Sequence, residues 1–430
     1  MINADINKIK KAILKENLSG WLFFSFKHRD SIADLLLKID KKATNSRGWF
    51  YIIAAEKENT KIVHSVEPDT LKEYSGKTII YTSKEELKAI LKQFSGMCFA
   101  VQSDNNLTQI SFLDNGTASI LCECGIKIVS SASLIKKMLG NLDNEQISMH
   151  EKAADLLYKI MEETWEYLSI NFKKSKKITE TLIQSFILER FEKNNLITNS
   201  PPLVAFGKNS ANPHYNTPCS FSHHPALIEP SQAFSRGLCR SRRISNQTTS
   251  KSSFLKKNTI IQFDIWAKCR TQNSSKIGNP GNKCVYADIS WVGFSGSDCP
   301  DEIVKSFDAI TGARDSVISF IKENLKAGKE VSGFDADKKA RNFLFDAGYK
   351  KDEIKHRTGH AIDIELHGYG TNLDSIEFPD KRILSNGSCF SVEPGLYFKD
   401  FGVRTEINCY IIKNKLYVSG GIPQNDIFMI

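Results

Sequence analysis

Three histidines stand close together in the segment HRTGHAIDIELH: His356, His360 and His367. The whole chain has only 9 histidines, so this is a marked concentration. Imidazole binds first-row transition metals and also transfers protons near neutral pH. This segment is therefore the first place to look for a functional site, as a source of metal ligands or of acid–base groups.

Four acidic residues in structured surroundings accompany the histidines. Asp264 lies in IIQFDIWA and Asp288 in VYADISWVGF, two apolar runs typical of strands. Glu393 follows in FSVEPGLYF and Glu406 in GVRTEINCYII. Any one of these acids is most simply a solvated charge or a turn cap. Four acids and a histidine, in this order, predict a metal site assembled on a sheet.

The predicted donor set consists of carboxylate oxygens and one imidazole, without a thiolate. Such ligands favour Mn²⁺, Co²⁺, Fe²⁺ or Zn²⁺ over Cu⁺ or an iron–sulfur cluster. Because carboxylates can bridge, five ligands suffice for two metal ions roughly 3.5–4 Å apart. A metal pair of this kind lowers the pKa of a bridging water and polarises a carbonyl group, which predicts hydrolytic chemistry.

The composition is that of a globular protein of 430 residues, long enough for two domains. The net charge of +9 is spread along the chain, so we expect a mildly basic surface and no nucleic-acid partner. No apolar run approaches the roughly 20 residues that span a bilayer, and no signal-like segment follows Met1. We therefore expect a cytoplasmic protein without membrane contact, whose 10 cysteines are reduced thiols.

Two patterns divide the chain. Residues 1–145 alternate strand-like runs, such as SGWLFFSF and RGWFYIIAA, with helical pieces such as SKEELKAILKQF, which predicts an α/β domain. A long helical pattern, HEKAADLLYKIMEETWEYLSINF, then begins a second domain over residues 146–430. Further helical patterns at residues 178–195, 301–328 and 335–350 are expected to cover its sheet.

The second domain must hold the two aspartates on neighbouring strands. A hairpin formed by the runs around Asp264 and Asp288 would bring both carboxylates to the same end. The polar segment 270–283 between them is too long for a tight turn, so we expect a solvent-exposed extension of the hairpin. Cys269 and Cys284 flank this segment and are expected to be unpaired thiols rather than a disulfide.

These motifs, in this order, resemble those of the pita-bread metallopeptidases, in the branch that holds Xaa-Pro aminopeptidase, prolidase and creatinase. The resemblance covers the chain from about Asn141 onward by motif, and the preceding part by layout only. It implies an α+β protein, with a pita-bread catalytic domain over residues 146–430 and a smaller creatinase-type α/β domain over residues 1–145. It also implies a homodimer and a peptide substrate with proline at its second position.

The resemblance further implies two divalent metal ions, with Mn²⁺ as the first choice and Co²⁺, Zn²⁺ or Fe²⁺ as alternatives. Asp288 and Glu406 would bridge the two ions. The complete set of implied ligands is Asp264, Asp288, His360, Glu393 and Glu406.

Other residues are implied to act on the substrate. Glu393 would accept a proton from the attacking water. His367 and His214, the latter in FGKNSANPHY, would stabilise the tetrahedral intermediate and the leaving nitrogen. His356 and Arg404 would serve substrate binding, His356 by lining the pocket and Arg404 by orienting the acids.

Four positions depart from the family pattern. Arg357 and Asp363 stand where glycine is usual, Gly368 where an acid is usual, and Trp291 where arginine is usual. The implied ligands are unaffected, so these departures bear on substrate preference.

Three functions are open at this point. The first is a dinuclear metal-dependent exopeptidase acting on Xaa-Pro bonds, most like an Xaa-Pro aminopeptidase. The second is a prolidase, which anchors a dipeptide carboxylate with an arginine upstream of the VEPG motif. Here Arg382 looks like a different arginine and the expected position falls near Pro379, which favours the aminopeptidase. The third is a catalytically altered binding protein, which the complete ligand set argues against.

Overall fold

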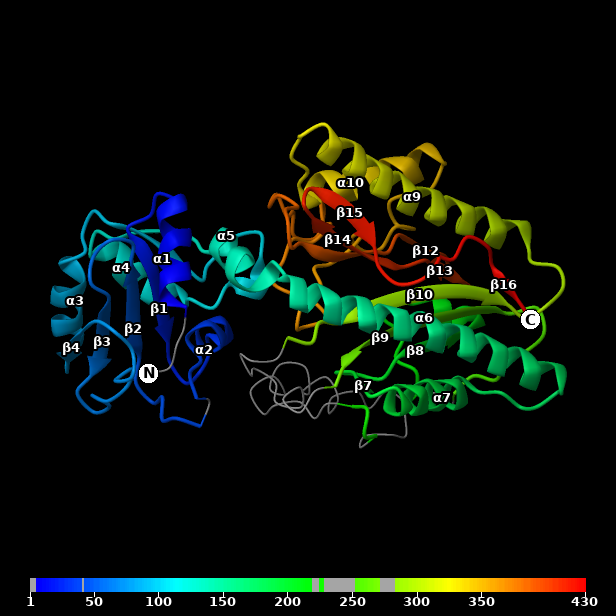
Figure 1. The fold of residues 1–430 in the computed structure, drawn as a ribbon, viewed down its shortest axis with the longest axis horizontal. Coiled ribbons are helices and arrows are strands. Elements are labelled where there is room, and N and C mark those ends of the chain that lie inside the picture. Colours follow the sequence, from blue (N-terminus) through cyan, green and yellow to red (C-terminus); the bar gives the residue numbers. More distant parts are fainter. Residues whose placement is uncertain (1–4, 41, 219–223, 228–251, 271–282) are drawn as a thin grey trace. The chain divides into compact units, whose positions relative to one another are not determined.

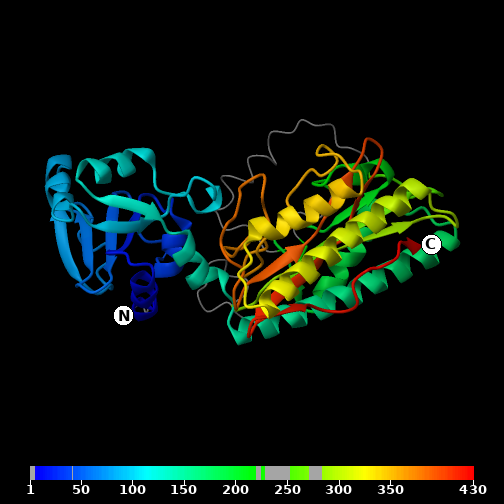
Figure 2. The same ribbon diagram turned by 90° about the horizontal axis from the view of Figure 1, so that it is seen from above.

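The computed structural model describes residues 5–40, 42–218, 224–227, 252–270 and 283–430. They form two compact units that divide between Leu139 and Gly140 (Figures 1 and 2). The boundary expected after residue 145 falls inside the first turn of helix α6 (Asn144–Lys173). Among the described residues, no helix is both long and apolar enough to cross a membrane.

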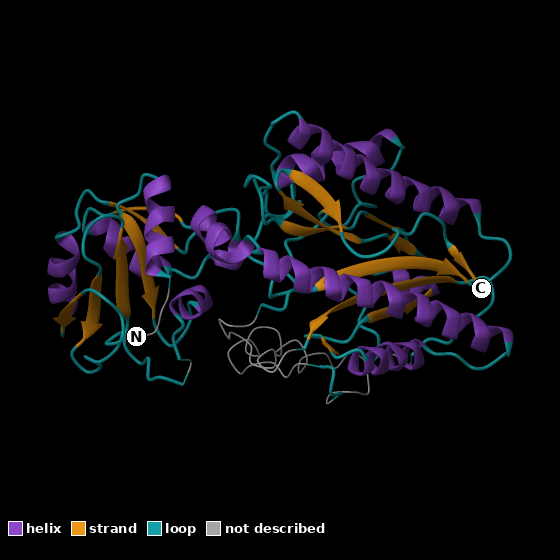
Figure 3. Ribbon diagram, in the orientation of Figure 1, coloured by secondary structure: helices purple, strands orange, loops and turns teal. Residues whose placement is uncertain are grey.

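The N-terminal unit is built on a mixed six-stranded sheet with helices around it (Figure 3). The strand order is β4-β3-β2-β1-β5-β6; β2 pairs antiparallel with both β1 and β3, and the other neighbours are parallel. The strands are β1 (Gly20–Ser25), β2 (Trp49–Ala54), β3 (Thr60–His64), β4 (Lys77–Tyr81), β5 (Cys98–Val101) and β6 (Lys127–Ser130). The helices are α1 (Ile6–Lys15), α2 (Ser31–Leu37), α3 (Lys84–Lys92), α4 (Asn115–Glu123) and α5 (Ala132–Ile135), with short turns η1 (Thr108–Ile110) and η2 (Lys136–Gly140).

The predicted alternation of strands and helices in this unit is confirmed from β1 to β5. Helix α3 begins as its sequence indicates, because Ser83 and Glu86 bond reciprocally to each other's backbone N–H groups. Strand β6 and helix α4 were not predicted. The short edge strand β6 is mostly exposed and mixes polar with apolar residues, so it lacks the clear alternation that marks a half-buried strand.

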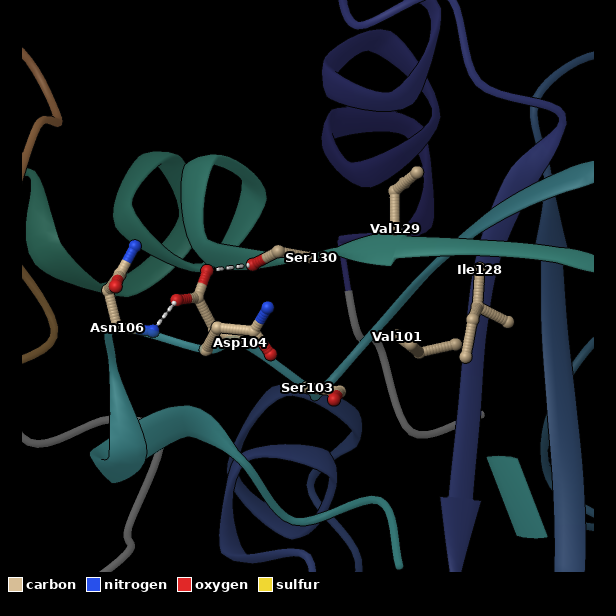
Figure 4. A pocket seen from close by; sticks show the side chains of 8 residues that line it. Val101, Ser103, Asp104, Asn106, Ile128, Val129 and Ser130 are labelled. Atoms are coloured by element: carbon tan, nitrogen blue, oxygen red, sulfur yellow. Dashed lines mark hydrogen bonds between the residues drawn. The ribbon is translucent and has the colours of Figure 1, made fainter. Parts of the chain in front are cut away.

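A cavity of about 310 Å³ lies at the ends of β5 and β6 (Figure 4). Its acidic side chain is Asp104. The Oδ1 atom of Asp104 accepts a hydrogen bond from the backbone N–H of Asn106 at 2.7 Å, and Oδ2 accepts one from the Ser130 hydroxyl at 2.5 Å. One oxygen of Asp104 thus stabilises its own turn, and the other joins that turn to the end of β6.

The described residues of the C-terminal unit form long helices and three sheets. The helices are α6, α7 (Glu180–Lys193), α9 (Asp301–Lys326) and α10 (Gly333–Asp346), with a short turn η3 (Gly207–Ala211). The strands are β7 (Leu196–Ile197), β8 (Leu203–Phe206), β9 (Ile260–Cys269), β10 (Ala287–Phe294), β11 (Cys389–Val392), β12 (Gly395–Tyr397), β13 (Gly402–Arg404), β14 (Ile407–Ile412), β15 (Lys415–Val418) and β16 (Phe428–Met429). The sheet orders are β16-β10-β9-β7 with β8 also on β9, β11-β14-β15, and β12-β13.

Two hydrophobic cores anchor the helix pairs of this unit. One core joins α6 and α7 to β8, β9 and β10 and contains the buried Trp165 and Phe263. The other joins α9 and α10 to β11, β13 and β14 and contains Phe307 and Phe390. The four predicted helices therefore cover the strands as expected, with each pair packed into its own core.

The predicted pairing of the two aspartate-bearing strands is confirmed, because β9 and β10 are antiparallel neighbours. Residues 271–282, the centre of the predicted hairpin extension, lie outside the described residues. Cys269 and Cys284, on either side of that segment, are buried and are not joined in a disulfide, as predicted.

Candidate metal centre

Strands β9 and β10 present Asp264 and Asp288 on one face. Ser290 lies opposite Asp264 in the ladder, and Asp288 is two residues before Ser290. Because side chains alternate between the two faces of a strand, these three residues point the same way. The alternate residues Phe263 and Ile289 point to the opposite face, into the core below α6. The two aspartates are thus held side by side by rigid, buried backbone.

The segment that carries His360 runs beside β11 and the residues after it. The backbone N–H of Ser391 donates to the His360 carbonyl at 2.8 Å, and that of Glu393 donates to the Thr358 carbonyl at 2.7 Å. The Ser391 hydroxyl accepts from the His360 N–H at 2.9 Å and donates to Glu393 Oε1 at 3.1 Å. One serine therefore ties the histidine backbone to the Glu393 carboxylate.

Glu406 is joined to β10 through Ser290. The Glu406 N–H donates to the Ser290 carbonyl at 3.1 Å, and the Ser290 hydroxyl donates to Glu406 Oε2 at 3.2 Å. Arg404, on β13, donates from Nε to the same hydroxyl at 3.1 Å and pairs through Nη2 with Asp264 Oδ2. The buried guanidinium therefore holds the Asp264 carboxylate beside the other acids.

The predicted ligands meet around His360. Its Nε2 atom lies 3.6 Å from Asp288 Oδ2, 3.4 Å from Glu393 Oε1 and 3.9 Å from Glu406 Oε1. Potential ligand atoms of Asp288, His360 and Glu406 all lie within 4.8 Å of one another. Asp264 is close enough for its charge to act on Asp288 and Glu406. The structure thus gathers all five residues at one place.

The electrostatics of this cluster show an excess of negative charge. Burial, followed by the charge of neighbouring acids, raises the pKa of Asp288 and Glu406 above the usual values. Burial alone would also raise the pKa of Glu393, but positive charge on His360 and Arg404 lowers it. Burial likewise opposes protonation of His360, yet the neighbouring Asp288 and Glu393 raise its pKa. The positive charge of the neighbouring side chains therefore does not balance the negative charge of all the acids.

Three buried carboxylate oxygens of the cluster accept no hydrogen bond from the described residues: Asp264 Oδ1, Asp288 Oδ1 and Glu406 Oε1. A buried polar atom is normally hydrogen-bonded, because leaving one unpaired costs about 1–3 kcal/mol. Divalent cations bind carboxylate oxygen and imidazole nitrogen, and their charge would offset the excess negative charge. The residues therefore fit a divalent metal site.

His367 stands next to His360 on the accessible side of the cluster. The two rings are edge to face, with centroids 4.4 Å apart and an interplanar angle of 88°. The His367 side chain is exposed. Desolvation by neighbouring protein atoms, together with positive charge on His360 and Arg357, lowers the pKa of His367. The ring is therefore neutral near pH 7 and donates a hydrogen bond from one nitrogen only.

His356 is half-buried and is linked to the cluster through Tyr397, a residue that the sequence did not indicate. The Tyr397 hydroxyl lies 2.8 Å from His356 Nε2 and accepts from Arg404 Nη1 at 3.0 Å. His356 Nδ1 lies 2.7 Å from the Arg357 carbonyl, so Nδ1 carries the proton and Nε2 accepts from Tyr397. The sequence shows only that Tyr397 carries a hydroxyl four positions after Glu393, and this alone does not indicate a role in the site.

His214 lies at the exposed edge of this site. Its side chain is exposed, and the carbonyl of the preceding Pro213 accepts a hydrogen bond from Arg404 Nη1 at 3.1 Å. Positive charge on His214 lowers the pKa of both His356 and His367. The loop that carries His214 is thus attached to the same arginine that holds Asp264.

The side chain of Trp291, at a position where arginine is usual in the family, points away from the cluster. This side chain is on the face of β10 opposite Asp288, and it packs edge to face against Tyr158 of α6 with centroids 6.0 Å apart. The change at this position therefore belongs to the hydrophobic core, and it does not alter the surroundings of the acids directly.

Residues 148–413 match metallopeptidase family M24, and the chain belongs to this family. The Xaa-Pro dipeptidase of Lactobacillus delbrueckii subsp. lactis is 25% identical over 218 residues, which are 50% of this chain and 44% of that protein. The match thus spans less than half of that relative. A putative Xaa-Pro aminopeptidase of Mycoplasma pneumoniae is 22% identical over 346 residues, 79% of each chain.

Dipeptidase PepE of Mycobacterium ulcerans has a similar fold. The TM-score is 0.64 at 18% sequence identity, over 99% of this chain and 96% of that one. The predicted α+β pita-bread fold is thereby confirmed.

Proposed function

We propose that this chain is a dinuclear metal-dependent exopeptidase that hydrolyses Xaa-Pro bonds, most like an Xaa-Pro aminopeptidase. The observation that carries this proposal is the gathering of His360 and four acids, with three buried carboxylate oxygens left without a hydrogen bond. The named activities of the relatives support the substrate class. Mn²⁺ is our first choice of metal, with Co²⁺, Zn²⁺ or Fe²⁺ as alternatives. The homodimer and the cytoplasmic location stay predictions.

Bound metal ions would lower the pKa of a water molecule and polarise the scissile carbonyl. The residues proposed to hold them are Asp264, Asp288, His360, Glu393 and Glu406. Glu393 is the acid best suited to accept a proton from the attacking water. Its side chain is 14% exposed. Burial raises its pKa, but the nearby positive charges, that of His360 first, lower it below the usual value, so Glu393 is ionised at neutral pH. A general base must be both ionised and reachable.

Two histidines are placed to act on the substrate. His367, neutral and accessible beside His360, is proposed to donate an N–H to the oxyanion that develops at the scissile carbonyl. His214, at the exposed edge, is proposed to donate to the leaving nitrogen. Each such donor contributes about 10²- to 10³-fold to the rate, because its hydrogen bond strengthens as charge develops in the transition state.

The aminopeptidase is favoured over the dipeptidase by the contacts of Arg382. Its guanidinium pairs with the Asp380 carboxylate at 2.7 Å and donates to the backbone carbonyls of Tyr369 and Gly370. An arginine used in this way inside the chain is not offered to the free carboxylate of a dipeptide.

A dipeptidase is the second candidate, and Arg357 favours it. This residue is half-buried, and its positive charge acts on His367 and Glu393, the two residues proposed to contact the reacting groups. A cation at that place suits the carboxylate of a short substrate. Arg357→Ala should therefore raise KM for a dipeptide more than for a tripeptide if the chain is a dipeptidase.

The activity test uses purified, Mn²⁺-loaded protein with three peptides: Gly-Pro, Xaa-Pro-Pro and the control Xaa-Ala-Pro. Release of the first residue from Xaa-Pro-Pro alone supports the aminopeptidase, and cleavage of Gly-Pro alone supports the dipeptidase. Asp288→Asn should abolish both metal binding and cleavage, whereas the exposed Asp298→Asn should change neither. Metal-loaded protein that cleaves none of the peptides contradicts the proposal and favours a binding protein.

A further inference from the structure

The turn formed by residues 363–369 carries His367 and is closed by its own backbone. The Gly368 N–H donates to the Ala361 carbonyl at 2.8 Å, which folds the turn back onto the segment that begins with His360. The His367 ring thereby meets the His360 ring edge to face. The orientation of His367 thus depends on what holds this turn.

Asp363 anchors the turn from inside. Its carboxylate is 1% exposed and accepts hydrogen bonds from the backbone N–H groups of Glu365 at 2.8 Å and Tyr369 at 2.6 Å. These two N–H groups lie on either side of His367 in the sequence. Because one side chain accepts from a residue on each side of His367, Asp363 fixes both ends of the turn.

The position of the Asp363 carboxylate requires glycine at residue 368. A Cβ atom added to Gly368 would lie 2.4 Å from Asp363 Oδ2 and 2.5 Å from its Cγ, distances at which one group must move. The two departures from the family pattern in this turn are therefore coupled. The acid at position 363 occupies the space that any side chain at position 368 would need.

Lys268 anchors the turn from outside. It lies on β9, four residues after Asp264, and is 5% exposed. Its Nζ donates to the backbone carbonyl of Ile364 and lies 4.6 Å from the centre of the Tyr286 ring. A buried ammonium is normally held by partners of this kind. The strand that carries one of the candidate ligands is thus tied directly to the turn that carries His367.

We propose that Asp363 and Lys268 are positioning residues that act through His367, by fixing the 363–369 turn so that this histidine faces the substrate. The proposal rests on the proposed peptidase function. Neither residue contacts the acids of the cluster in the structure, so neither is needed to hold metal. Their effect should therefore appear in kcat, with metal content unchanged.

The test is a double-mutant cycle in the full-length, Mn²⁺-loaded protein. Asp363→Asn places an amide N–H₂ against one of the two backbone N–H donors, and it should lower kcat by about 10- to 100-fold, the scale seen when a supporting partner is lost. Gly368→Ala, which pushes the carboxylate out, and Lys268→Met should act in the same direction. In the His367→Ala background, Asp363→Asn should have little further effect, because the residue it positions is absent.

Asp374→Asn is the matched control. Asp374 is equally buried and accepts backbone hydrogen bonds from Ile376 at 3.0 Å, Glu377 at 2.9 Å and Phe378 at 3.1 Å, but its turn does not carry His367. It should lower thermal stability comparably to Asp363→Asn and leave kcat near the wild-type value.

Three outcomes overturn the inference: unchanged kcat in Asp363→Asn, an equal loss in the wild-type and His367→Ala backgrounds, or loss of metal from Asp363→Asn. Failure of the proposed function would look different, because wild-type protein would then cleave no Xaa-Pro peptide. If the wild type is active and Asp363→Asn has the same kcat as the Asp374→Asn control, the inference about Asp363 is wrong and the proposed function still holds.

Discussion

The histidines of this site differ in their surroundings, and this separates their proposed roles. His360 is 3% exposed and lies within 4 Å of three carboxylates, whereas His367 is open to solvent on one side and His214 is exposed. A buried imidazole among acids suits a metal ligand. An accessible neutral imidazole suits a hydrogen-bond donor to the substrate.

The first prediction follows from this difference. His360→Ala should reduce bound metal as well as rate, because it removes the imidazole at the centre of the cluster. His367→Ala and His214→Ala should keep the metal and lower kcat by about 10²- to 10³-fold, the loss expected for one oxyanion donor. Metal content by elemental analysis, measured with kcat on the same samples, checks all three variants. If His367→Ala lost the metal and His360→Ala kept it, the two assignments would be exchanged.

Tyr397 gives a second prediction at this scale. Tyr397→Phe removes the hydroxyl that joins His356 Nε2 to Arg404 Nη1 and leaves the aromatic packing intact. We expect kcat/KM to fall by roughly 10-fold or more with metal retained, as for other supporting partners. Tyr417→Phe, an exposed residue of β15, is the matched control and should be neutral. Equal kcat/KM in the two variants would show that the bridge is dispensable.

The sequence identified the five candidate ligands because each lies in a recognisable local context of strand or turn. Tyr397, Lys268 and Asp363 were not recognised as supporting residues. Their roles depend on partners that are distant in sequence or on the shape of a closed turn: Tyr397 and His356 are 41 residues apart, and Lys268 and Ile364 are 96 apart. No local pattern records such pairings.

At the scale of elements, strands β9 and β10 set the spacing of the two aspartates. Their ladder runs from Ala267 paired with Ala287 to Ile260 paired with Phe294, so the register is fixed well beyond the connecting segment. The helices followed from apolar periodicity, and the two strands of the hairpin followed from their apolar, strand-like runs. Strand β16 did not, because it is a short exposed segment whose parallel pairing with β10 is purely tertiary.

A third prediction tests whether the metal site is independent of the segment that connects β9 and β10. Replacing residues 271–282 with a short Asn-Gly hairpin should leave metal content unchanged, since the paired strands rather than their connection hold Asp264 and Asp288. Metal analysis of the shortened protein against wild type is the measurement. A variant that folds, by circular dichroism, yet binds no metal would show that the connection helps to form the site.

At the scale of the whole molecule, His150 links parts of the C-terminal unit that are far apart in the chain. From α6 its Nδ1 lies 2.6 Å from the Tyr286 carbonyl, and its Nε2 lies 2.8 Å from the Ser419 hydroxyl. The residue is fully buried, and this burial lowers its pKa below the usual 6.5. In the folded state His150 therefore stays neutral at pH values at which it would be protonated in the unfolded chain.

A fourth prediction concerns the effect of His150 on stability. As pH falls below about 6.5, His150 gains a proton in the unfolded chain but stays neutral in the folded unit. The free energy of unfolding therefore decreases, by at most ~1.4 kcal/mol per pH unit. Above that pH the effect disappears. The difference in unfolding free energy between wild type and His150→Gln, measured by urea denaturation at several pH values, isolates this contribution because other groups are common to both. Parallel pH profiles for the two proteins would contradict it.

The last prediction concerns where the C-terminal unit begins. Asn141 pairs with Ser388, the Leu142 N–H donates to the Gly387 carbonyl at 2.8 Å, and Asp143 caps α6. A fragment of residues 140–430 keeps these contacts, whereas one of residues 146–430 loses a helix cap worth about 1 kcal/mol and the burial of Leu142, worth roughly 1.5–3 kcal/mol. Both retain all five candidate ligands, so both should bind Mn²⁺. The shorter fragment should unfold at lower urea concentration and several degrees lower in temperature. Identical unfolding of the two would place the start of the unit at residue 146, as the sequence pattern alone indicated.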